Sequence, residues 1–362
     1  MGNHTAYDLK QMQSLPLEVK IIMSQQRIRQ WFDYWDGQVY VSFSGGKDST
    51  VLKHLVENTP GVYGVPSLFV NTGLEYPEIQ KFAMSQPNVT TVRPEMRFDE
   101  AIKKYGYPMI SKEVSNTISG AKNSIKKGVY SLRLSKLGVR KDEYGGLFDS
   151  GMFNYESALN KSMYRQDKWR FLLDSDFDVS SYCCDIMKKK PAKQYEKETG
   201  RKAIIGTMAW ESQNRRTAWI KHGCNAFESN HPTSQPISFW TEQDILHYIK
   251  KYSIPYCSVY GDIVVYTDAD IPEGQMNIID YLGAYEEGDR LKTTGCDRTG
   301  CVFCAFGITQ DGCPNRFQQL KETHPRLYDY CINGGEFVDG KWRPNKEGLG
   351  LGYVLNYIGI DY

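Results

Sequence analysis

A glycine-rich segment, Ser44-Gly45-Gly46-Lys47-Asp48-Ser49, constrains the fold of this chain more than any other feature. It lies between a strand-like run, VYVSF at residues 39–43, and a helix-like run, STVLKHL at residues 49–55. Where a strand gives way to a helix at paired glycines, unpaired backbone N–H groups and the helix dipole attract an anion. The glycines also let a phosphate approach the backbone without a Cβ in between. The segment therefore predicts a phosphate-binding loop.

Strand-like and helix-like runs alternate along much of the remaining chain. We expect strands at residues 66–70, 89–92 and 202–206, and helices at 77–84 and from Thr241 to about Lys251. This alternation predicts an α/β fold with a doubly wound, mainly parallel sheet. Helical insertions and a C-terminal cysteine-rich extension are expected in addition.

Three regions are expected along the chain. Residues 1–37 form an N-terminal helical cover, with one helix over 8–36 and an apolar stripe made of Leu17, Val19, Ile21, Ile22, Ile28 and Trp31. Residues 38–260 form the phosphate-binding α/β domain, with an insertion at about 127–180. Residues 261–362 form an extension that holds a cysteine cluster and a helix at 314–331.

Composition narrows the cellular setting and the partners. The net charge is only +1, so the molecule as a whole is not an electrostatic nucleic-acid binder. A local basic group can contact nucleic acid or stay solvated: Lys122, Lys126, Lys127, Arg133, Lys136 and Arg140. No apolar run approaches the ~20 residues of a membrane span, and the N-terminus lacks a signal-like core. We expect a cytoplasmic protein without a membrane partner, in which nine cysteines are metal ligands or redox groups rather than disulfides.

Three polar segments each follow an expected strand: the glycine-rich loop, residues 71–75 and residues 206–216. Ligands of open α/β sheets bind at the carboxyl ends of the strands, so the three segments are expected to converge on one site. The candidate ligand-binding residues are Ser44, Gly45, Gly46, Lys47, Asp48, Ser49, Thr72, Gly73, Glu75, Gly206, Glu211, Arg215 and Arg216.

Each charged candidate has an expected role. Lys47 is expected to be a point charge on the phosphates, and Asp48 is expected to hold Mg²⁺ through water. Arg215 and Arg216 suit bidentate phosphate contact, with a solvated helix face as the alternative. Glu211 is expected to orient an arginine. Lys47, Asp48 and Arg215 are therefore the candidate catalytic residues, while Lys112 is left open between an anion contact and a surface role.

The glycine-rich loop is too short for a G-x-x-x-x-G-K-[ST] P-loop. It resembles the SGGxDS loop of the PP-loop ATP pyrophosphatases, or adenine nucleotide α-hydrolases. Three further segments resemble the phosphoadenylyl-sulfate (PAPS) reductase-like family within that group: NTGLEYPE at 71–78, GTMAWESQNRR at 206–216 and PISFWTEQDILHYI at 236–249. Asn71 stands where the family commonly has an acidic residue, and Met208 where it often has arginine. The resemblance implies that the ligand is an adenine nucleotide, either ATP or an adenylyl sulfate.

A cysteine pair and a distant CxxC together supply four thiolates: Cys183, Cys184, Cys301 and Cys304. They resemble the cluster ligands of the iron–sulfur sulfonucleotide reductases, which implies a [4Fe-4S] cluster. A local set of Cys296, Cys301, Cys304 and Cys313 can instead bind zinc or a cluster, and free buried thiols are a third interpretation. Cys224, Cys257 and Cys331 are expected to be buried small residues.

The family resemblance leaves three functions open. Sulfonucleotide reductases use a cysteine in an ECGxH-like tail, whereas residues 348–362 contain none and Cys331 lacks that context. Classical reduction is therefore not expected. The first interpretation is cleavage of ATP between its α- and β-phosphates with adenylation of an acceptor, nucleic acid included, for sulfur transfer from a donor. The second is a divergent sulfonucleotide reductase that uses a thiol reductant. The third is a nucleotide-binding regulatory or defence subunit with little turnover, and a homodimer is compatible with all three.

Overall fold

The computed structural model describes residues 4–139, 166–266 and 289–362. The chain forms two compact units that alternate along the sequence. Unit 1 consists of Met1–Arg93 and Pro191–Gly300, and unit 2 of Pro94–Lys190 and Cys301–Tyr362. The division into 1–37, 38–260 and 261–362 stays a prediction. Residues 140–165 of the insertion expected at about 127–180, Arg140 among them, lie outside the described residues.

Unit 1 contains the largest sheet in the described part of the chain, with strand order β3-β2-β1-β5-β7-β6. All neighbours pair in parallel except β6 and β7, which are antiparallel. The strands are β1 (Val39–Phe43), β2 (Ser67–Val70), β3 (Val89–Val92), β5 (Lys202–Ile205), β6 (Asn225–Ala226) and β7 (Thr233–Ser234). The predicted mainly parallel α/β sheet is thus confirmed.

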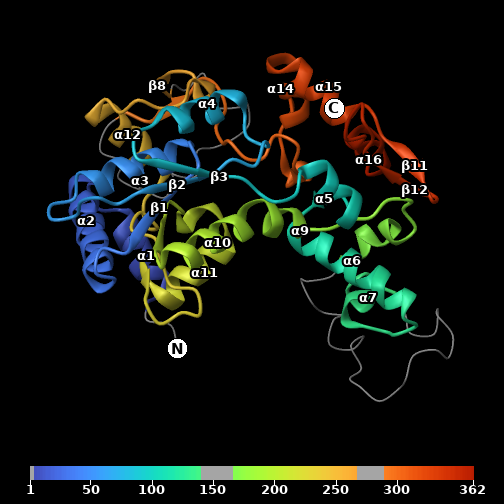
Figure 1. Cartoon of the computed structure of the whole chain (residues 1–362), viewed down its shortest axis with the longest axis horizontal. Helices are drawn as coiled ribbons and strands as arrows, with labels where there is room; N and C mark the ends of the chain where they lie inside the picture. Colours follow the sequence, from blue (N-terminus) through green and yellow to red (C-terminus); the bar gives the residue numbers. More distant parts are fainter. Residues whose placement is uncertain (1–3, 140–165, 267–288) are drawn as a thin grey trace. The chain divides into compact units, whose positions relative to one another are not determined.

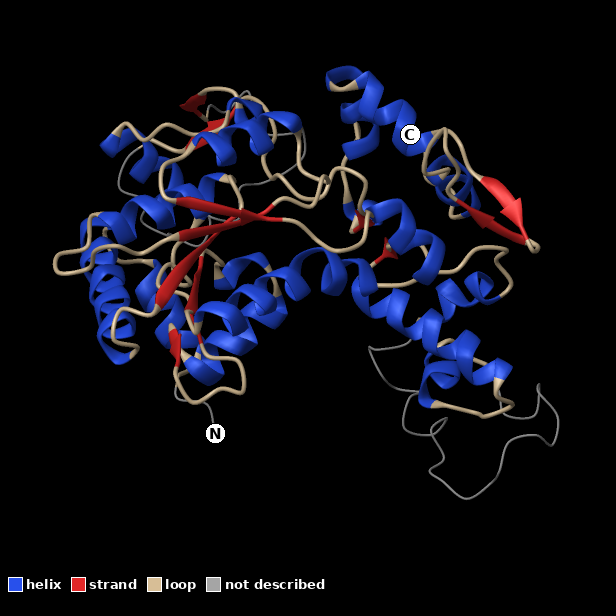
Figure 2. Ribbon diagram, in the orientation of Figure 1, coloured by secondary structure: helices blue, strands red, loops and turns tan. Residues whose placement is uncertain are grey.

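Helices cover both faces of this sheet (Figures 1 and 2). On one face, Val39 and Val41 of β1 join a core with residues of α2 and α3, such as Trp31 and Leu52. On the other face, Tyr40 packs against Tyr195 of α10. The helices of unit 1 are α1 (Ala6–Gln13), α2 (Leu17–Tyr34), α3 (Lys47–Glu57), α4 (Pro77–Ser85), α10 (Lys190–Thr199), α11 (Gln213–His222) and α12 (Glu242–Tyr252). A doubly wound sheet needs apolar side chains on both faces, and alternate residues of β1 supply them.

Short elements complete unit 1. They are the 3₁₀ turns η4 (Ala209–Glu211) and η5 (Ser258–Tyr260) and the antiparallel pair β8 (Ile263–Val265) and β9 (Leu291–Thr293). The helix α12 begins where the sequence indicates, because Thr241 and Asp244 form a reciprocal capping box.

The expectation of one helix over residues 8–36 is wrong. The chain forms α1 and α2 instead, and Pro16 precedes the first residue of α2. Proline lacks the N–H that a continuous helix would need at this position. Of the expected apolar stripe, Ile21, Ile28 and Trp31 are buried, whereas Val19 and Ile22 are exposed.

Unit 2 is mainly helical. Its helices are α5 (Phe98–Tyr105), α6 (Lys112–Lys126), α7 (Leu132–Lys136), α9 (Tyr182–Cys184), α14 (Arg316–Thr323), α15 (Pro325–Ile332) and α16 (Leu351–Tyr357), with a π-helix η3 (Asp185–Lys189) and the 3₁₀ turns η2 (Asp167–Leu173) and η7 (Ile308–Gln310). Its strands are β4 (Met109–Ile110), β10 (Ala305–Phe306), β11 (Glu336–Val338) and β12 (Lys341–Arg343). The single helix expected at 314–331 is wrong, since Pro325 begins a second helix there. Within the described ranges, no helix is both long and apolar enough to cross a membrane.

A buried ion pair ties α2 to α12. The Lys20 ammonium donates to both carboxylate oxygens of Asp244, at 2.8 and 2.7 Å, and the two side chains are only 3% and 10% exposed. On the same helix, Arg29 pairs with Asp33, but these side chains are 46% and 52% exposed. Removing one partner of the buried pair leaves a buried charge without compensation, whereas water solvates the charge that remains at the exposed pair.

We therefore expect Lys20→Met to lower the free energy of unfolding by about 3–5 kcal/mol. Arg29→Met, the matched change on the same helix, should cost less than about 1 kcal/mol, because water screens an exposed pair. Urea denaturation followed by tryptophan fluorescence measures both. Equal losses for the two variants would contradict this account of the α2–α12 contact.

Candidate functional site

The glycine-rich loop has the local geometry expected from its sequence. Gly45 adopts φ 73°, and a Cβ there would lie 3.0 Å from the carbonyl oxygen of Ile79. The Ser44 N–H donates to Ser49 Oγ at 3.1 Å, and the two serine hydroxyls are 3.0 Å apart. Gly46 is the N-cap of α3 and supplies no side chain to cap it. The loop therefore places the start of α3 at the carboxyl end of β1, where Gly46 adds no capping side chain.

Lys47, the predicted phosphate contact, is surrounded by groups of the protein itself. Its ammonium lies 3.0 Å from Glu242 Oε1 and donates to the carbonyl oxygen of Asp297. The same ammonium is 5.2 Å from the centre of the Tyr260 ring, and the Lys47 N–H donates to the Tyr260 hydroxyl at 3.2 Å. Lys47 is only 4% exposed. A phosphate would therefore have to replace Glu242 as its ion-pair partner.

Asp48 carries a buried carboxylate oxygen, Oδ1, that has no hydrogen-bond partner among the described residues. Burial raises the pKa of Asp48, and Glu242 adds to the increase, while Lys47, Arg298 and Arg215 oppose it. Carboxylate oxygens are the ligands that Mg²⁺ prefers, so an unsatisfied one beside a phosphate-binding loop fits a magnesium–nucleotide complex.

The other candidate residues divide between structural contacts and exposed positions. The Thr72 N–H and hydroxyl both donate to the Glu75 carboxylate, at 3.1 and 2.6 Å, and thereby fold the turn after β2. Gly73 has φ 73° within that turn. Gly206 lies against α3, where a Cβ would be 3.3 Å from the Asp48 carbonyl oxygen. Arg216 is exposed.

Glu211 lies between two arginines. Its carboxylate accepts from the Met208 N–H at 2.8 Å and forms an ion pair with Arg215. Its other oxygen is 3.9 Å from Arg298 Nη2. The Arg298 guanidinium also lies 5.0 Å from the centre of the Trp210 ring. Burial lowers the pKa of Arg215, and the charge of Arg298 lowers it further.

Residues 297–299 lie against the glycine-rich loop within unit 1 and are not among the ligand-binding residues predicted from the sequence. The Gly295 N–H donates to the Tyr260 carbonyl oxygen at 2.8 Å, and the Thr299 and Tyr260 hydroxyls are 2.6 Å apart. Asp297 and Arg298 reach Lys47 and Glu211, as described above. The run Arg298-Thr299-Gly300 stands directly before the CxxC in the sequence, but no sequence spacing predicts that it lies near residue 47.

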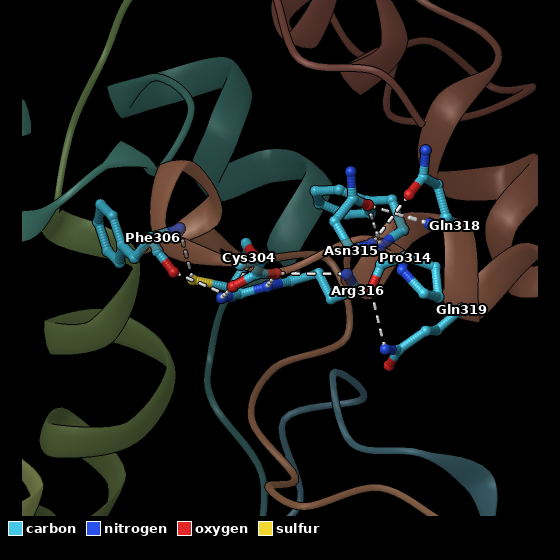
Figure 3. A network of polar contacts seen from close by, with 9 residues as sticks. Cys304, Phe306, Pro314, Asn315, Arg316, Gln318 and Gln319 are labelled. Carbon is cyan, nitrogen blue, oxygen red and sulfur yellow. Dashed lines mark hydrogen bonds and ion pairs between the residues drawn. The ribbon is translucent and has the colours of Figure 1, made fainter. Parts of the chain in front are cut away.

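The four cysteines of the predicted cluster set all belong to unit 2. Cys183 and Cys184 lie in α9, which continues into the π-helix η3, a geometry often found at functional sites. Cys301 and Cys304 form a turn in which the Cys304 N–H donates to the Cys301 carbonyl oxygen at 3.1 Å. The Phe306 N–H donates to Cys304 Sγ at 3.5 Å (Figure 3). Backbone N–H groups directed at sulfur are a property that tunes iron–sulfur clusters.

Arg316 holds the CxxC turn in place (Figure 3). Its guanidinium donates to the carbonyl oxygens of Cys304, at 3.2 Å, and Phe306, at 2.9 Å. A bidentate ion pair with Asp311 fixes the guanidinium. On the far side of the turn, β10 pairs in parallel with β4, and the Gly307 N–H donates to the Ile110 carbonyl oxygen at 2.7 Å.

The thiols influence one another electrostatically. A hydrogen bond from Cys183 lowers the pKa of Cys184 to about 6, and Lys112 and Lys188 contribute to the decrease. Burial raises the pKa of Cys304 to about 11, with further increases from the charges of Cys301 and Cys184. Lys112, which the sequence left open, therefore acts electrostatically on Cys184.

The described cysteines are not gathered around a single metal ion. In residues 4–139, 166–266 and 289–362, no three His, Cys, Asp or Glu side chains are arranged to hold one metal ion. One zinc ion requires its sulfurs at about 2.3 Å from a common point, whereas the iron atoms of a cluster each take a separate sulfur. Of the alternative ligands, Cys313 is exposed and Cys296 belongs to unit 1. Burial of the remaining three cysteines is confirmed: Cys224, Cys257 and Cys331.

The sequence matches the phosphoadenosine phosphosulfate reductase domain over residues 38–163 and 152–306, which is more than half of the chain. The chain belongs to this reductase-domain family. The resemblance predicted from the SGGKDS loop and the three later segments is thus confirmed. Met208, where the family often has arginine, is 2% exposed and packs in the core of unit 1.

Two solved structures are similar to this reductase-domain protein. A PAPS reductase from Candida auris, in complex with phosphate, is 15% identical, with 65% of this chain and 82% of that chain covered and a TM-score of 0.34. The U34-tRNA thiolase NcsA from Methanococcus maripaludis, with its [4Fe-4S] cluster, is 13% identical, with 73% and 71% covered and a TM-score of 0.31. Both are too distant to transfer a residue's role. A comparison with curated proteins finds no match.

Asp48 makes the stability of this reductase-domain protein depend on pH. Its folded-state pKa is raised above the value of about 3.9 in an unfolded chain, so the folded state holds the proton more tightly. The wild type therefore loses stability as pH rises from the unfolded pKa through the folded one. Asp48→Asn removes this loss. We expect Asp48→Asn without nucleotide to have the higher Tm at pH 7 and the difference to shrink toward pH 4, as measured by calorimetry. A difference that is constant with pH would contradict the assignment.

Proposed function

We propose that unit 1 binds ATP as its magnesium complex and that the protein cleaves ATP between the α- and β-phosphates, transferring the adenylyl group to an acceptor. The observation that carries this proposal is the buried Asp48 oxygen, Oδ1, which has no hydrogen-bond partner among the described residues and lies beside Lys47 at the start of α3. A carboxylate repels phosphates unless a cation lies between them or a proton neutralises it. Asp48 would hold Mg²⁺, which supplies neutralisation of the phosphate charge when bound.

The reaction needs no oxidant or reductant. A nucleophilic oxygen of the acceptor attacks the α-phosphorus, an O–P bond forms, the bond to the β-phosphate bridging oxygen breaks, and pyrophosphate leaves with that electron pair. Arg215 would stabilise the negative charge that develops on the phosphate oxygens. Lys47 would exchange its contact with Glu242 for a phosphate oxygen. The positive end of the α3 dipole would attract the same anion.

The first test measures products from ATP and Mg²⁺, with and without candidate acceptors. We expect pyrophosphate and AMP or an adenylylated acceptor, and a rate about 100-fold lower for Asp48→Asn, because the variant loses charge where the cation binds. Lys221→Ala changes an exposed residue in the last turn of α11, at the opposite end of that helix from Arg215. This variant should keep the wild-type rate. Sulfite release from an adenylyl sulfate with a thiol reductant, without pyrophosphate from ATP, would contradict the proposal in favour of a reductase. Tight ATP binding without any product would favour a regulatory subunit.

We also propose that Cys183, Cys184, Cys301 and Cys304 hold a [4Fe-4S] cluster in unit 2. The N–H of Phe306 directed at Cys304 Sγ and the cation of Lys112 near Cys184 support this, because both stabilise an anionic metal–thiolate group. When bound, the cluster supplies redox chemistry at a potential that such hydrogen bonds adjust. Arg316 would keep the CxxC turn in position whether or not iron is present.

Iron and sulfide content of anaerobically prepared protein tests this assignment. We expect Cys183→Ser and Cys304→Ser to lose most of the iron and the visible absorption, because each removes one thiolate of four. Cys313→Ser should keep both. If Cys313→Ser loses the iron while Cys183→Ser keeps it, the local set with Cys296 is the ligand set instead. A colourless protein that contains zinc and no iron would rule out the cluster.

A further inference from the structure

We infer that Arg298 is a second phosphate-binding arginine of the nucleotide site, acting together with Arg215 on the β- and γ-phosphates. The inference rests on the proposed binding of ATP in unit 1. Neither the loop motif nor the segment at 206–216 contains this residue. Arg298 comes from the part of unit 1 that immediately precedes the CxxC.

The contacts of Glu211 place the two arginines together. One oxygen of Glu211 pairs with Arg215, and the other lies 3.9 Å from Arg298 Nη2. The Glu211 side chain is 15% exposed, whereas those of Arg215 and Arg298 are 40% and 55% exposed. The largely buried Glu211 carboxylate thus lies between two guanidinium groups that are both partly exposed to solvent.

The two guanidinium groups are close enough to repel each other. Both pair with Glu211, and burial together with the charge of Arg298 lowers the pKa of Arg215, while Asp48 opposes the decrease. Both arginines also act on the Asp48 carboxyl group, which lies at the start of α3. A polyphosphate with Mg²⁺ brings excess negative charge and would relieve the repulsion between the guanidinium groups.

The Trp210 ring lies against the Arg298 guanidinium and limits the freedom of that side chain. The guanidinium lies 5.0 Å from the centre of the indole ring, and Trp210 itself is 42% exposed. A planar guanidinium that stacks on an aromatic ring loses less freedom when it forms hydrogen bonds to phosphate. Position 208 supplies no cation to the site, because Met208 is buried in the core.

A purely structural role for Arg298 predicts a different result. If its only task were to hold residues 295–299 against η4, its loss would disturb Lys47 through Asp297 and weaken every adenine nucleotide alike. A direct contact with the terminal phosphates would instead weaken ATP far more than AMP, which lacks them. The two roles therefore separate by ligand rather than by stability alone.

The experiment titrates the full chain with α,β-methylene-ATP and Mg²⁺, and separately with AMP, by calorimetry. For Arg298→Ala we expect Kd for the ATP analogue to rise about 10- to 100-fold, as for the loss of a hydrogen bond to a charged group, and Kd for AMP to change less than about 3-fold. Arg298→Lys keeps the charge but loses the planar fork, so its Kd should lie between. Lys221→Ala serves as the exposed control, and the Tm of each ligand-free variant reports on folding.

Three outcomes would overturn the inference. An unchanged Kd for the ATP analogue in both Arg298 variants would exclude a phosphate contact. Equal weakening of the ATP analogue and AMP would assign Arg298 to the structural role. Wild-type protein that binds neither nucleotide would overturn the proposed function together with this inference, whereas the first two outcomes leave ATP binding by unit 1 intact.

Discussion

The start of α3 places two opposite charges side by side: Lys47 is buried, and one carboxylate oxygen of Asp48 is buried as well. Lys47 is balanced by Glu242 of α12 and by the Asp297 carbonyl oxygen, which come from distant parts of the sequence. The charges of Lys47, Arg298 and Arg215 act on the Asp48 carboxyl group. In the proposed function, a magnesium–nucleotide complex would complete the charge balance of this loop.

The cysteine turn in unit 2 is held in place by backbone pairing and by the Arg316 side chain. Arg316 binds two carbonyl oxygens of the turn, and β10 pairs with β4 beside it. Ile110, at the end of β4, adopts φ 62°, which costs a β-branched residue about 1–3 kcal/mol. The strained residue stands directly before Ser111 and Lys112, which begin α6. The strained Ile110 thus lies next to the segment that carries Lys112, whose charge acts on Cys184.

The sequence predicts the parts of this molecule that local rules determine. The bounds of β1, β2, β3 and α12 follow from short apolar runs and the Thr241–Asp244 capping box, so they could be placed without tertiary information. Pro16 and Pro325 are visible in the sequence as helix breaks. The apolar periodicity on both sides of each proline nevertheless indicated one continuous helix. Residues 295–299 could not be placed, because their contacts with Tyr260 and Lys47 depend on tertiary packing across a long sequence separation.

Three unusual local features lie at the two candidate sites. They are a buried Asp48 oxygen, Oδ1, without a hydrogen-bond partner among the described residues, the guanidinium groups of Arg215 and Arg298 that both pair with Glu211, and a π-helix directly after Cys184. A core assembled for stability alone would pair or remove such groups. Their placement at the start of α3 in unit 1 and beside a cysteine pair in unit 2 agrees with the proposed sites for a nucleotide with its cation and for a metal cluster.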